Sequence, residues 1–203
     1  MAALLDPPLA PFAATIAALD DATLARMRGR SWQDDPRCPA PAALARVAVR
    51  HLTMAGAVAD GELVVARALA AEVVALFGRL YAIGFPLTRV ALVDDYDADD
   101  QRSMAADNSS GFNFRVVAGT SVLSQHALGI AIDLNPIENP MVWPGGERCE
   151  PTAGAGFLDR TRVRPGMIVR PGPVTAIFDE LGWEWGGDWR HVADLHHIAW
   201  SRR

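Results

Sequence analysis

One long amphipathic pattern stands out in the middle of this chain. Between Arg67 and Ile83, apolar residues recur every three or four positions, as on one face of a helix, and Gly84 and Pro86 follow. Two shorter segments before it, at 46–52 and 61–65, predict strands. Helices and strands do not alternate regularly, as they would around a parallel sheet, so the pattern predicts an α+β fold.

The rest of the chain predicts short elements separated by loops. Asp20 and Asp21 are candidate N-caps for a helix that carries Leu24 and Met27 on one face. Residues 136–172 are rich in proline and glycine and predict loop. The other expectations are one or two helices within 10–28, a helix at 174–181 ending at Gly182, strands at 90–93 and 131–134, an extended segment at 112–118, and strand and loop over 183–200.

The composition is that of a globular protein. Half of the 203 residues are hydrophobic, 21% are charged, and no run of 18 apolar residues predicts a transmembrane segment. The net charge of −5 argues against nucleic acid as a partner, because phosphate binding needs clustered basic residues. The first residues lack the basic start of a secretory signal, which favours a cytoplasmic protein. Cys38 and Cys149 are too few for a disulfide framework, and their pairing stays open, as does the oligomeric state.

An acidic stretch follows the strand predicted at 90–93. Its five carboxylates are Asp94, Asp95, Asp97, Asp99 and Asp100. The spacing lacks the glycine and the closing glutamate of an EF-hand calcium loop. The stretch therefore predicts a solvated or ion-paired loop.

The histidines indicate a metal site. His126 lies seven residues before Asp133, and three of the five histidines lie in the last 13 residues, beside Asp188 and Asp194. Two imidazoles and one carboxylate suit a divalent cation such as zinc and leave a fourth position for water. Gly129 permits a tight passage between His126 and the strand that bears Asp133.

Both segments resemble the signatures of an enzyme family. Residues 124–135 read SQHALGIAIDLN, which matches the Ser-x-His-x-x-Gly-x-Ala-x-Asp signature of the zinc D-alanyl-D-alanine carboxypeptidases of the VanY type, relatives of the phage L-alanyl-D-glutamate endopeptidases. Residues 183–198 read WEWGGDWRHVADLHHI and resemble the second signature, Trp-Gly-Gly-Asp-Trp followed by Asp-x-x-His-aromatic. The resemblance covers roughly residues 40–203. It implies a fold like that of hedgehog and DD-peptidase domains, a small antiparallel sheet flanked by helices at 41–203, with an N-terminal helical extension at 1–40.

The resemblance also implies the zinc site and its acid/base. His126, Asp133 and His197 fall on the positions of the zinc ligands, and Asp194 falls on the position of the catalytic acid/base. Counting from Asp194 in Asp-x-x-His selects His197 over His196, and neighbours on an extended segment point to opposite faces.

Further residues fall on substrate-binding positions, each with an ordinary alternative. Arg115 would stabilise the oxyanion or hold a substrate carboxylate, but it could instead pair with the acidic stretch. Ser124 would hydrogen-bond substrate or the ligand shell, or cap a turn. Trp185 and Trp189 would wall the cleft or belong to the core. Asp188 would orient a ligand or its loop.

The sequence departs from near relatives around the site. Ile198 replaces the aromatic residue after the last ligand, Leu128 replaces a common tyrosine, and Phe114 replaces a common cysteine. All ligand and acid/base positions are kept, so the departures affect packing and substrate subsites.

The function implied is a zinc metallopeptidase that hydrolyses peptidoglycan stem peptides or muropeptides. A D-Ala-D-Ala carboxypeptidase is the first interpretation, and an L-alanyl-D-glutamate endopeptidase is the second. A non-catalytic zinc-containing binding module of the same fold is the alternative from another class. The substrate class implies the cell envelope, in tension with the missing export signal.

Overall fold

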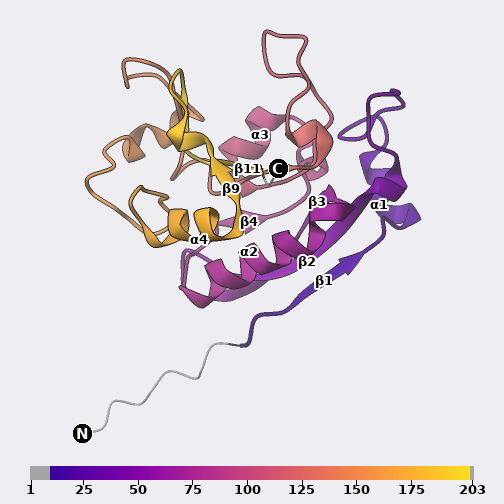
Figure 1. The fold of residues 1–203 in the computed structure, drawn as a ribbon, viewed down its shortest axis with the longest axis horizontal. Coiled ribbons are helices and arrows are strands. Elements are labelled where there is room, and N and C mark those ends of the chain that lie inside the picture. Colours follow the sequence, from indigo (N-terminus) through magenta and orange to yellow (C-terminus); the bar gives the residue numbers. More distant parts are fainter. Residues whose placement is uncertain (1–9, 202–203) are drawn as a thin grey trace, which may run out of the picture.

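A three-stranded antiparallel sheet forms the floor of the molecule in the computed structural model, which describes residues 10–201 (Figure 1). The strand order is β1 (Ala14–Ala17), β2 (Leu44–Leu52), β3 (Val58–Ala66). Along β3 successive side chains point to opposite faces. Leu63 and Val65 enter the main core, whereas Val64 packs with the smaller cluster of Met27, Leu44, Leu92 and Phe112.

The helix α2 (Ala70–Ala82) covers one face of this sheet and confirms the helix predicted over 67–83. A 3-10 turn at Arg67–Leu69 precedes it. Its apolar face is buried mainly against β2 through Val73, Leu76, Phe77 and Leu80. Gly84 follows at a φ of +73°, which favours glycine because a Cβ crowds the backbone there.

The N-terminal part differs from the prediction of helices alone. β1 is a strand that pairs antiparallel with β2, so the helix prediction is wrong for residues 14–17. The hydrogen bonds that β2 offers along its free edge decide this short segment, whose own pattern is weak. The helix α1 (Asp21–Met27) follows, and the predicted cap Asp20 accepts a hydrogen bond from Thr23 N at 2.7 Å. Residues 1–9 of the predicted extension lie outside the described residues, and its described strand shares a sheet with the predicted peptidase domain.

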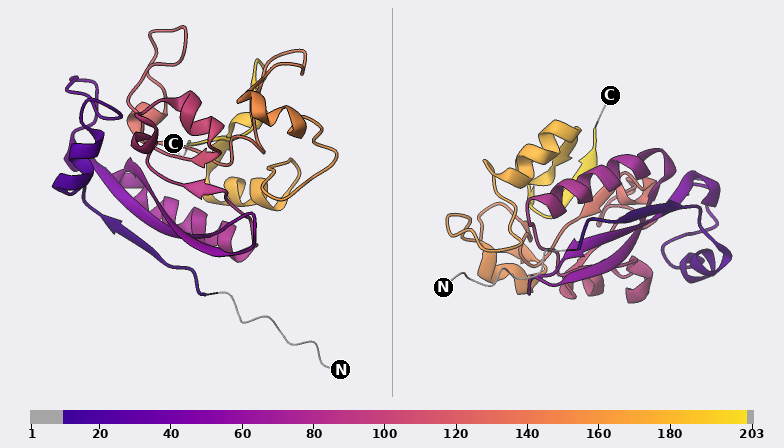
Figure 2. Two further views of the ribbon diagram at one scale, coloured as in Figure 1. Left: turned by 180° about the vertical axis from the view of Figure 1, so that it is seen from behind. Right: turned by 90° about the horizontal axis from the view of Figure 1, so that it is seen from below.

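A second antiparallel sheet carries the site. Its order is β6 (Ala131–Asp133), β11 (His197–Trp200), β9 (Trp183–Trp185), and α4 (Pro173–Leu181) lies between β9 and α2 (Figures 1 and 2). Gly182, at a φ of +84°, ends α4 as predicted. Core residues of both sheets and both helices form one apolar cluster.

Short elements complete the fold. β4 (Arg89–Val90) and β5 (Asn108–Ser109) form a parallel pair, and α3 (Asp100–Ala105) precedes β5. β7 (Met141–Val142) lies between β8 (Cys149–Glu150) and β10 (Ala193–Asp194). The overall class is α+β, with small antiparallel sheets, as the sequence predicts.

Two extended segments are shorter than predicted. The strand predicted at 90–93 gives way to a 3-10 turn at Val93–Tyr96, and residues 112–118 form one isolated bridge, Val116 to Leu123. Val90, Leu92, Val93 and Phe112 are nevertheless buried, so packing rather than strand pairing holds these segments.

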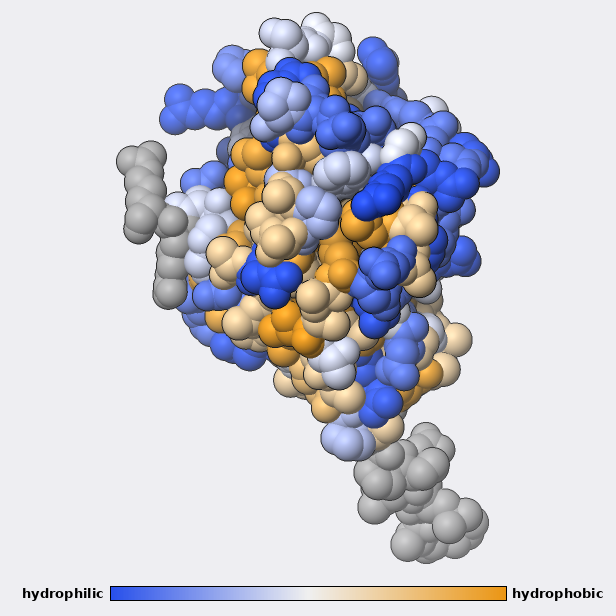
Figure 3. Space-filling view, turned by 90° about the vertical axis from the view of Figure 1, so that its right-hand side faces the viewer, coloured by the Kyte–Doolittle hydropathy of each residue, from blue (hydrophilic) through white to orange (hydrophobic). Residues whose placement is uncertain are grey.

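The surface mixes apolar and charged residues. Figure 3 shows apolar residues gathered in a central band with hydrophilic residues around it. The acidic stretch is ion-paired as expected, for example Asp95 with Arg26 at 2.7 Å. No helix among residues 10–201 is long and apolar enough to cross a membrane. Cys38 and Cys149 are both free thiols.

Candidate metal centre

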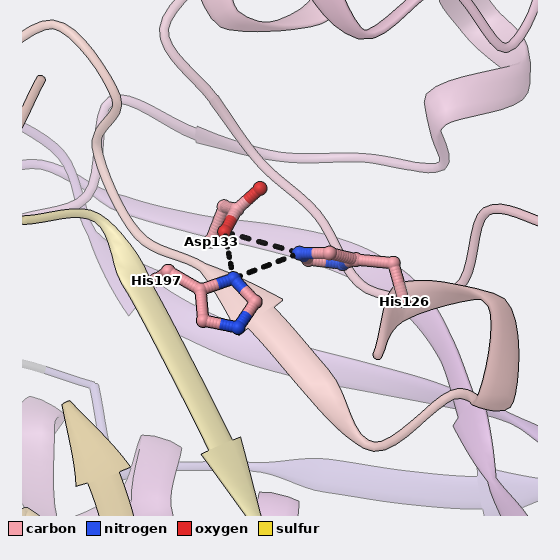
Figure 4. Close-up of side chains that lie close together, drawn as sticks. All are labelled: His126, Asp133 and His197. Carbon is pink, nitrogen blue, oxygen red and sulfur yellow. Dashed lines mark hydrogen bonds and ion pairs between the residues drawn. The ribbon is translucent and has the colours of Figure 1, made fainter. Parts of the chain in front are cut away.

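Three side chains from two segments that are distant in sequence meet at one end of the second sheet. Asp133 ends β6 and His197 begins β11, and the two residues are direct partners in the antiparallel register. Partners in such a pair project on the same face, so the strand pairing itself brings the carboxylate to the imidazole. His126 approaches from the 3-10 turn His126–Leu128 (Figure 4). All three residues are buried.

The three facing atoms form an equilateral triangle. His126 Nε2, His197 Nδ1 and Asp133 Oδ1 lie 3.2 Å from one another on every side (Figure 4). A tetrahedral metal ion with bonds of about 2.0–2.1 Å places its ligand atoms roughly 3.3 Å apart. The triangle therefore has the size of one face of such a tetrahedron.

The outer nitrogens of the two imidazoles are held by acceptors. His126 Nδ1 lies 2.7 Å from the carbonyl oxygen of Gly111, and His197 Nε2 lies 2.9 Å from Gln125 Oε1. Because a carbonyl oxygen only accepts, these ring nitrogens carry the protons. When each ring is neutral, its inner nitrogen presents a lone pair to a carboxylate oxygen, an arrangement that a cation stabilises. The residues fit a divalent metal ion.

The first sheet fixes His126 through two glycines. A Cβ at Gly129 would lie 2.5 Å from Ala66 N, and a Cβ at Gly111 would lie 2.5 Å from Val64 O, so only glycine lets these segments run along β3. The backbone bonds Ala66 N to Gly129 O (2.8 Å) and Phe112 N to Val64 O (2.7 Å) hold them there. Gly129 thus makes the tight passage that the sequence predicts, at a φ of +68°.

The electrostatics of the cluster favour a bound positive charge. Burial raises the pKa of the Asp133 carboxyl, but His126 and His196 outweigh burial and hold that pKa well below its ordinary value. Burial lowers the pKa of the His126 imidazole, but the Asp133 carboxylate outweighs it, and the net shift is upward. The buried carboxylate therefore favours a cation beside it, a proton or a metal ion.

Asp194 and His196 form a second polar pair beside the triangle. Asp194 lies on β10, and its Oδ1 is 2.9 Å from His196 Nε2, although the two atoms are poorly aligned for a hydrogen bond. Burial lowers the pKa of His196, but the carboxylates of Asp194 and Asp133 outweigh burial and raise it to about 9. His196 Nε2 lies 3.9 Å from Asp133 Oδ1 and is not part of the triangle, which contains His197.

Arg115 and Ser124 both take the ordinary alternative in this structure. Arg115 forms an ion pair with Asp100 of the acidic stretch. Ser124 Oγ accepts a hydrogen bond from His126 N at 3.2 Å, and Ser124 O accepts one from Ala127 N at 3.0 Å, so Ser124 caps the turn that carries His126. Substrate roles for both residues stay predictions.

The two tryptophans of the second motif differ in exposure. Trp185 is buried in the core, where its indole N–H donates to Leu195 O at 2.9 Å, and it also lines a pocket together with Trp189. Trp189 is 41% exposed, and its ring lies 5.1 Å from that of His197. It lines an open pocket of about 500 Å³ formed by residues 188–192. Asp188 pairs with Arg170 at 3.1 Å, which ties down this loop.

The motif glycines have a packing role. A Cβ at Gly186 would lie 2.6 Å from Asp194 O and 3.2 Å from His197 Cβ, and one at Gly187 would lie 2.4 Å from the Trp185 ring. Gly186 lets the 3-10 turn Gly186–Asp188 pack directly against the segment that bears Asp194 and His197, and Gly187 lets the turn lie against the Trp185 ring.

Sequence reasoning missed the partners that orient the site. Gln125 directly precedes His126 in the first motif, and this position is the feature of the sequence that could have indicated its role. Gly111 O contributes a backbone atom, and Asn139 contacts His196 from 57 residues away. Neither leaves a pattern in the sequence.

One comparison with known proteins covers the residues that make up the site. Residues 118–200 match a family model described as D-alanyl-D-alanine carboxypeptidase. The matched segment contains His126, Asp133, Asp194 and His197, and Arg115 lies before it. Neither the search of curated proteins nor the search of solved structures found a match. The match supports the family that the motifs resemble, and with it a peptidase.

Proposed function

We propose that this protein is a zinc peptidase that hydrolyses peptidoglycan stem peptides, with the D-Ala-D-Ala bond as its first substrate. The observation that carries this is the triangle of His126, Asp133 and His197, whose outer nitrogens are both held by acceptors. Two imidazoles and a carboxylate with tetrahedral spacing suit zinc. The family match over residues 118–200 supports the substrate class.

The number of ligands favours an enzyme over a structural zinc module. Structural zinc sites have four protein ligands, whereas catalytic sites have three and an open position. Among residues 10–201, the cluster comprises three residues. The nearby His196 is engaged by Asn139 and Asp194 instead.

The chain's own residues supply the proton transfers. Zinc, when bound, supplies Lewis acidity that polarises a carbonyl and lowers the pKa of water. The Asp194 carboxylate takes the proton from the attacking water and delivers it to the leaving amine. Trp189, exposed against the His197 ring, offers an apolar wall for the substrate. Arg115, which pairs with Asp100 in this structure, would stabilise the oxyanion once substrate draws it away from that carboxylate.

The test combines metal content with product analysis. We expect about one zinc per chain by elemental analysis, and release of D-alanine from pentapeptide muropeptides. Asp194→Asn should lower kcat by about 10²–10⁴-fold with zinc content unchanged. Cleavage between L-Ala and D-Glu would select the endopeptidase, and bound zinc without hydrolysis of either bond would select the binding module. Because the substrate class belongs to the cell envelope, we also propose that the protein acts there.

A further inference from the structure

His196 lies in a buried network that neither the metal triangle nor the family signatures explain. It directly precedes the proposed ligand His197, and its side chain is almost fully buried. Its backbone continues the pairing of the second sheet, since Leu134 N donates to His196 O at 3.0 Å. The ring is therefore placed by the same strand that places His197.

The Asn139 carbonyl fixes the orientation of this ring. His196 Nδ1 lies 2.9 Å from Asn139 O, and because a carbonyl only accepts, Nδ1 is the donor. Nε2, on the other side of the ring, then faces Asp194 Oδ1 at 2.9 Å. The imidazole thus spans the gap between a backbone carbonyl and one oxygen of the proposed acid/base.

Asn139 itself is held rigidly. It is fully buried, and its Oδ1 accepts from Ile168 N at 2.6 Å and from Arg160 at 2.9 Å. Its Nδ2 donates to three backbone carbonyls, those of Leu134, Asn135 and Gly166, at 3.2, 3.2 and 2.9 Å. A buried amide whose oxygen and nitrogen are both hydrogen-bonded in this way keeps its atoms in one position. The carbonyl that anchors His196 is consequently part of the rigid body of the protein.

We propose that His196 is a positioning residue for Asp194. Its ring, anchored on Asn139 O, holds Asp194 Oδ1 through the 2.9 Å ion-pair contact with Nε2, and Oδ2 is thereby left to carry the proton between water and the leaving amine. Gly186 closes the other side of Asp194, because a Cβ there would lie 3.0 Å from Asp194 Cβ. A displacement of about 1 Å at a reacting group costs about 10²-fold in rate, so this support matters for kcat. The inference rests on the proposed function.

Two substitutions distinguish the contact that His196 makes through Nδ1 from the one it makes through Nε2. His196→Asn keeps a donor near Nδ1 for Asn139 O and loses the contact with Asp194. His196→Gln keeps a donor near Nε2 for Asp194 and loses the anchor. We expect His196→Asn to lower kcat by about 10²-fold with KM within about twofold, and His196→Gln to recover part of that loss. Zinc content should stay unchanged in both, since His196 lies outside the triangle.

A double-mutant cycle and a matched control complete the test. In the Asp194→Asn background, His196→Asn should lower kcat no further, because it acts through Asp194. His51→Asn replaces another buried histidine, in the sheet that carries no cluster residue, and should leave kcat unchanged. Wild-type kcat in both His196 variants, or loss of zinc from His196→Asn, would overturn the proposal.

Crystal structures keep the two proposals apart. If the zinc-loaded wild type hydrolyses no stem peptide, the proposed function fails, and the position of the Asp194 carboxylate still decides the role of His196. A carboxylate displaced in His196→Asn and restored in His196→Gln supports positioning. An unmoved carboxylate in a folded His196→Asn overturns it.

Discussion

The two antiparallel sheets of this protein contrast in what their buried side chains do. In the first sheet, nine-residue strands bury aliphatic side chains under α2. In the second, β6 and β11 span three and four residues and lead into buried polar groups, among them Asp133, His196 and His197. Buried apolar area stabilises a fold, whereas buried polar groups cost stability unless each finds a partner. The first sheet thus stabilises the fold, and the second carries the buried polar site.

The contact between the two regions is narrow and specific. β3 receives the backbone of Gly111 and Gly129, and these two residues flank His126 in space. The apolar sheet therefore positions a polar site that it does not itself contain. Substitutions should distinguish the two regions. Those in the triangle should abolish metal binding without unfolding the protein, and those in the core should lower stability without weakening metal binding.

The largest effect is expected from removing a triangle residue. His126→Ala takes away one of three ligand atoms, so metal binding and peptide hydrolysis should both be lost. Zinc at a hundredfold excess over its Kd should stabilise the wild type by about 2.7 kcal/mol and raise its Tm, and it should leave the Tm of the variant unchanged. Elemental analysis and thermal unfolding with and without zinc measure both outcomes. His51→Ala is the control, and retained metal in His126→Ala would contradict the assignment.

The same contrast explains what the sequence could predict. The pattern from Arg67 to Ile83 is long and periodic, and it predicts α2 within a few residues. β1 was mistaken for helix because its four residues have no strong pattern, and the edge of β2 decides their structure. Local pattern is enough where a long apolar face is buried, and it fails where a neighbour far along the chain supplies the hydrogen bonds.

The site divides in a similar way. His126, Asp133 and His197 were predicted from motifs, and the structure brings them together, while their role as ligands stays a prediction. Trp185 could not be told from Trp189, because burial depends on packing that the motif does not encode. The Asn139 anchor of His196 is a backbone carbonyl, so no side-chain pattern marks it.

A core substitution should give the opposite result to His126→Ala. Phe77 on α2 is fully buried in the core that both sheets share. Phe77→Ala removes most of a large side chain and leaves a cavity, so the free energy of unfolding should fall by about 3–5 kcal/mol. Zinc per folded chain should stay the same. Denaturant unfolding and elemental analysis test this, with Phe77→Leu as the milder control, and weaker zinc binding by the folded variant would show that the two regions are coupled.

The smallest effect is expected at Gln125. This residue tests whether a side-chain contact to His197 contributes to zinc affinity. Its Oε1 lies 2.9 Å from His197 Nε2 and so directs Nδ1 toward Asp133. Partners of this kind contribute about 10–100-fold to metal affinity. Gln125→Ala should weaken zinc binding by that factor in a chelator competition at fixed pH, whereas Gln125→Glu keeps an acceptor and should retain most of the affinity. Equal affinity in all three proteins would mean that the pairing of β6 with β11 orients His197 without help from Gln125. The apolar packing beneath the site would then contribute more to zinc binding than its polar surroundings.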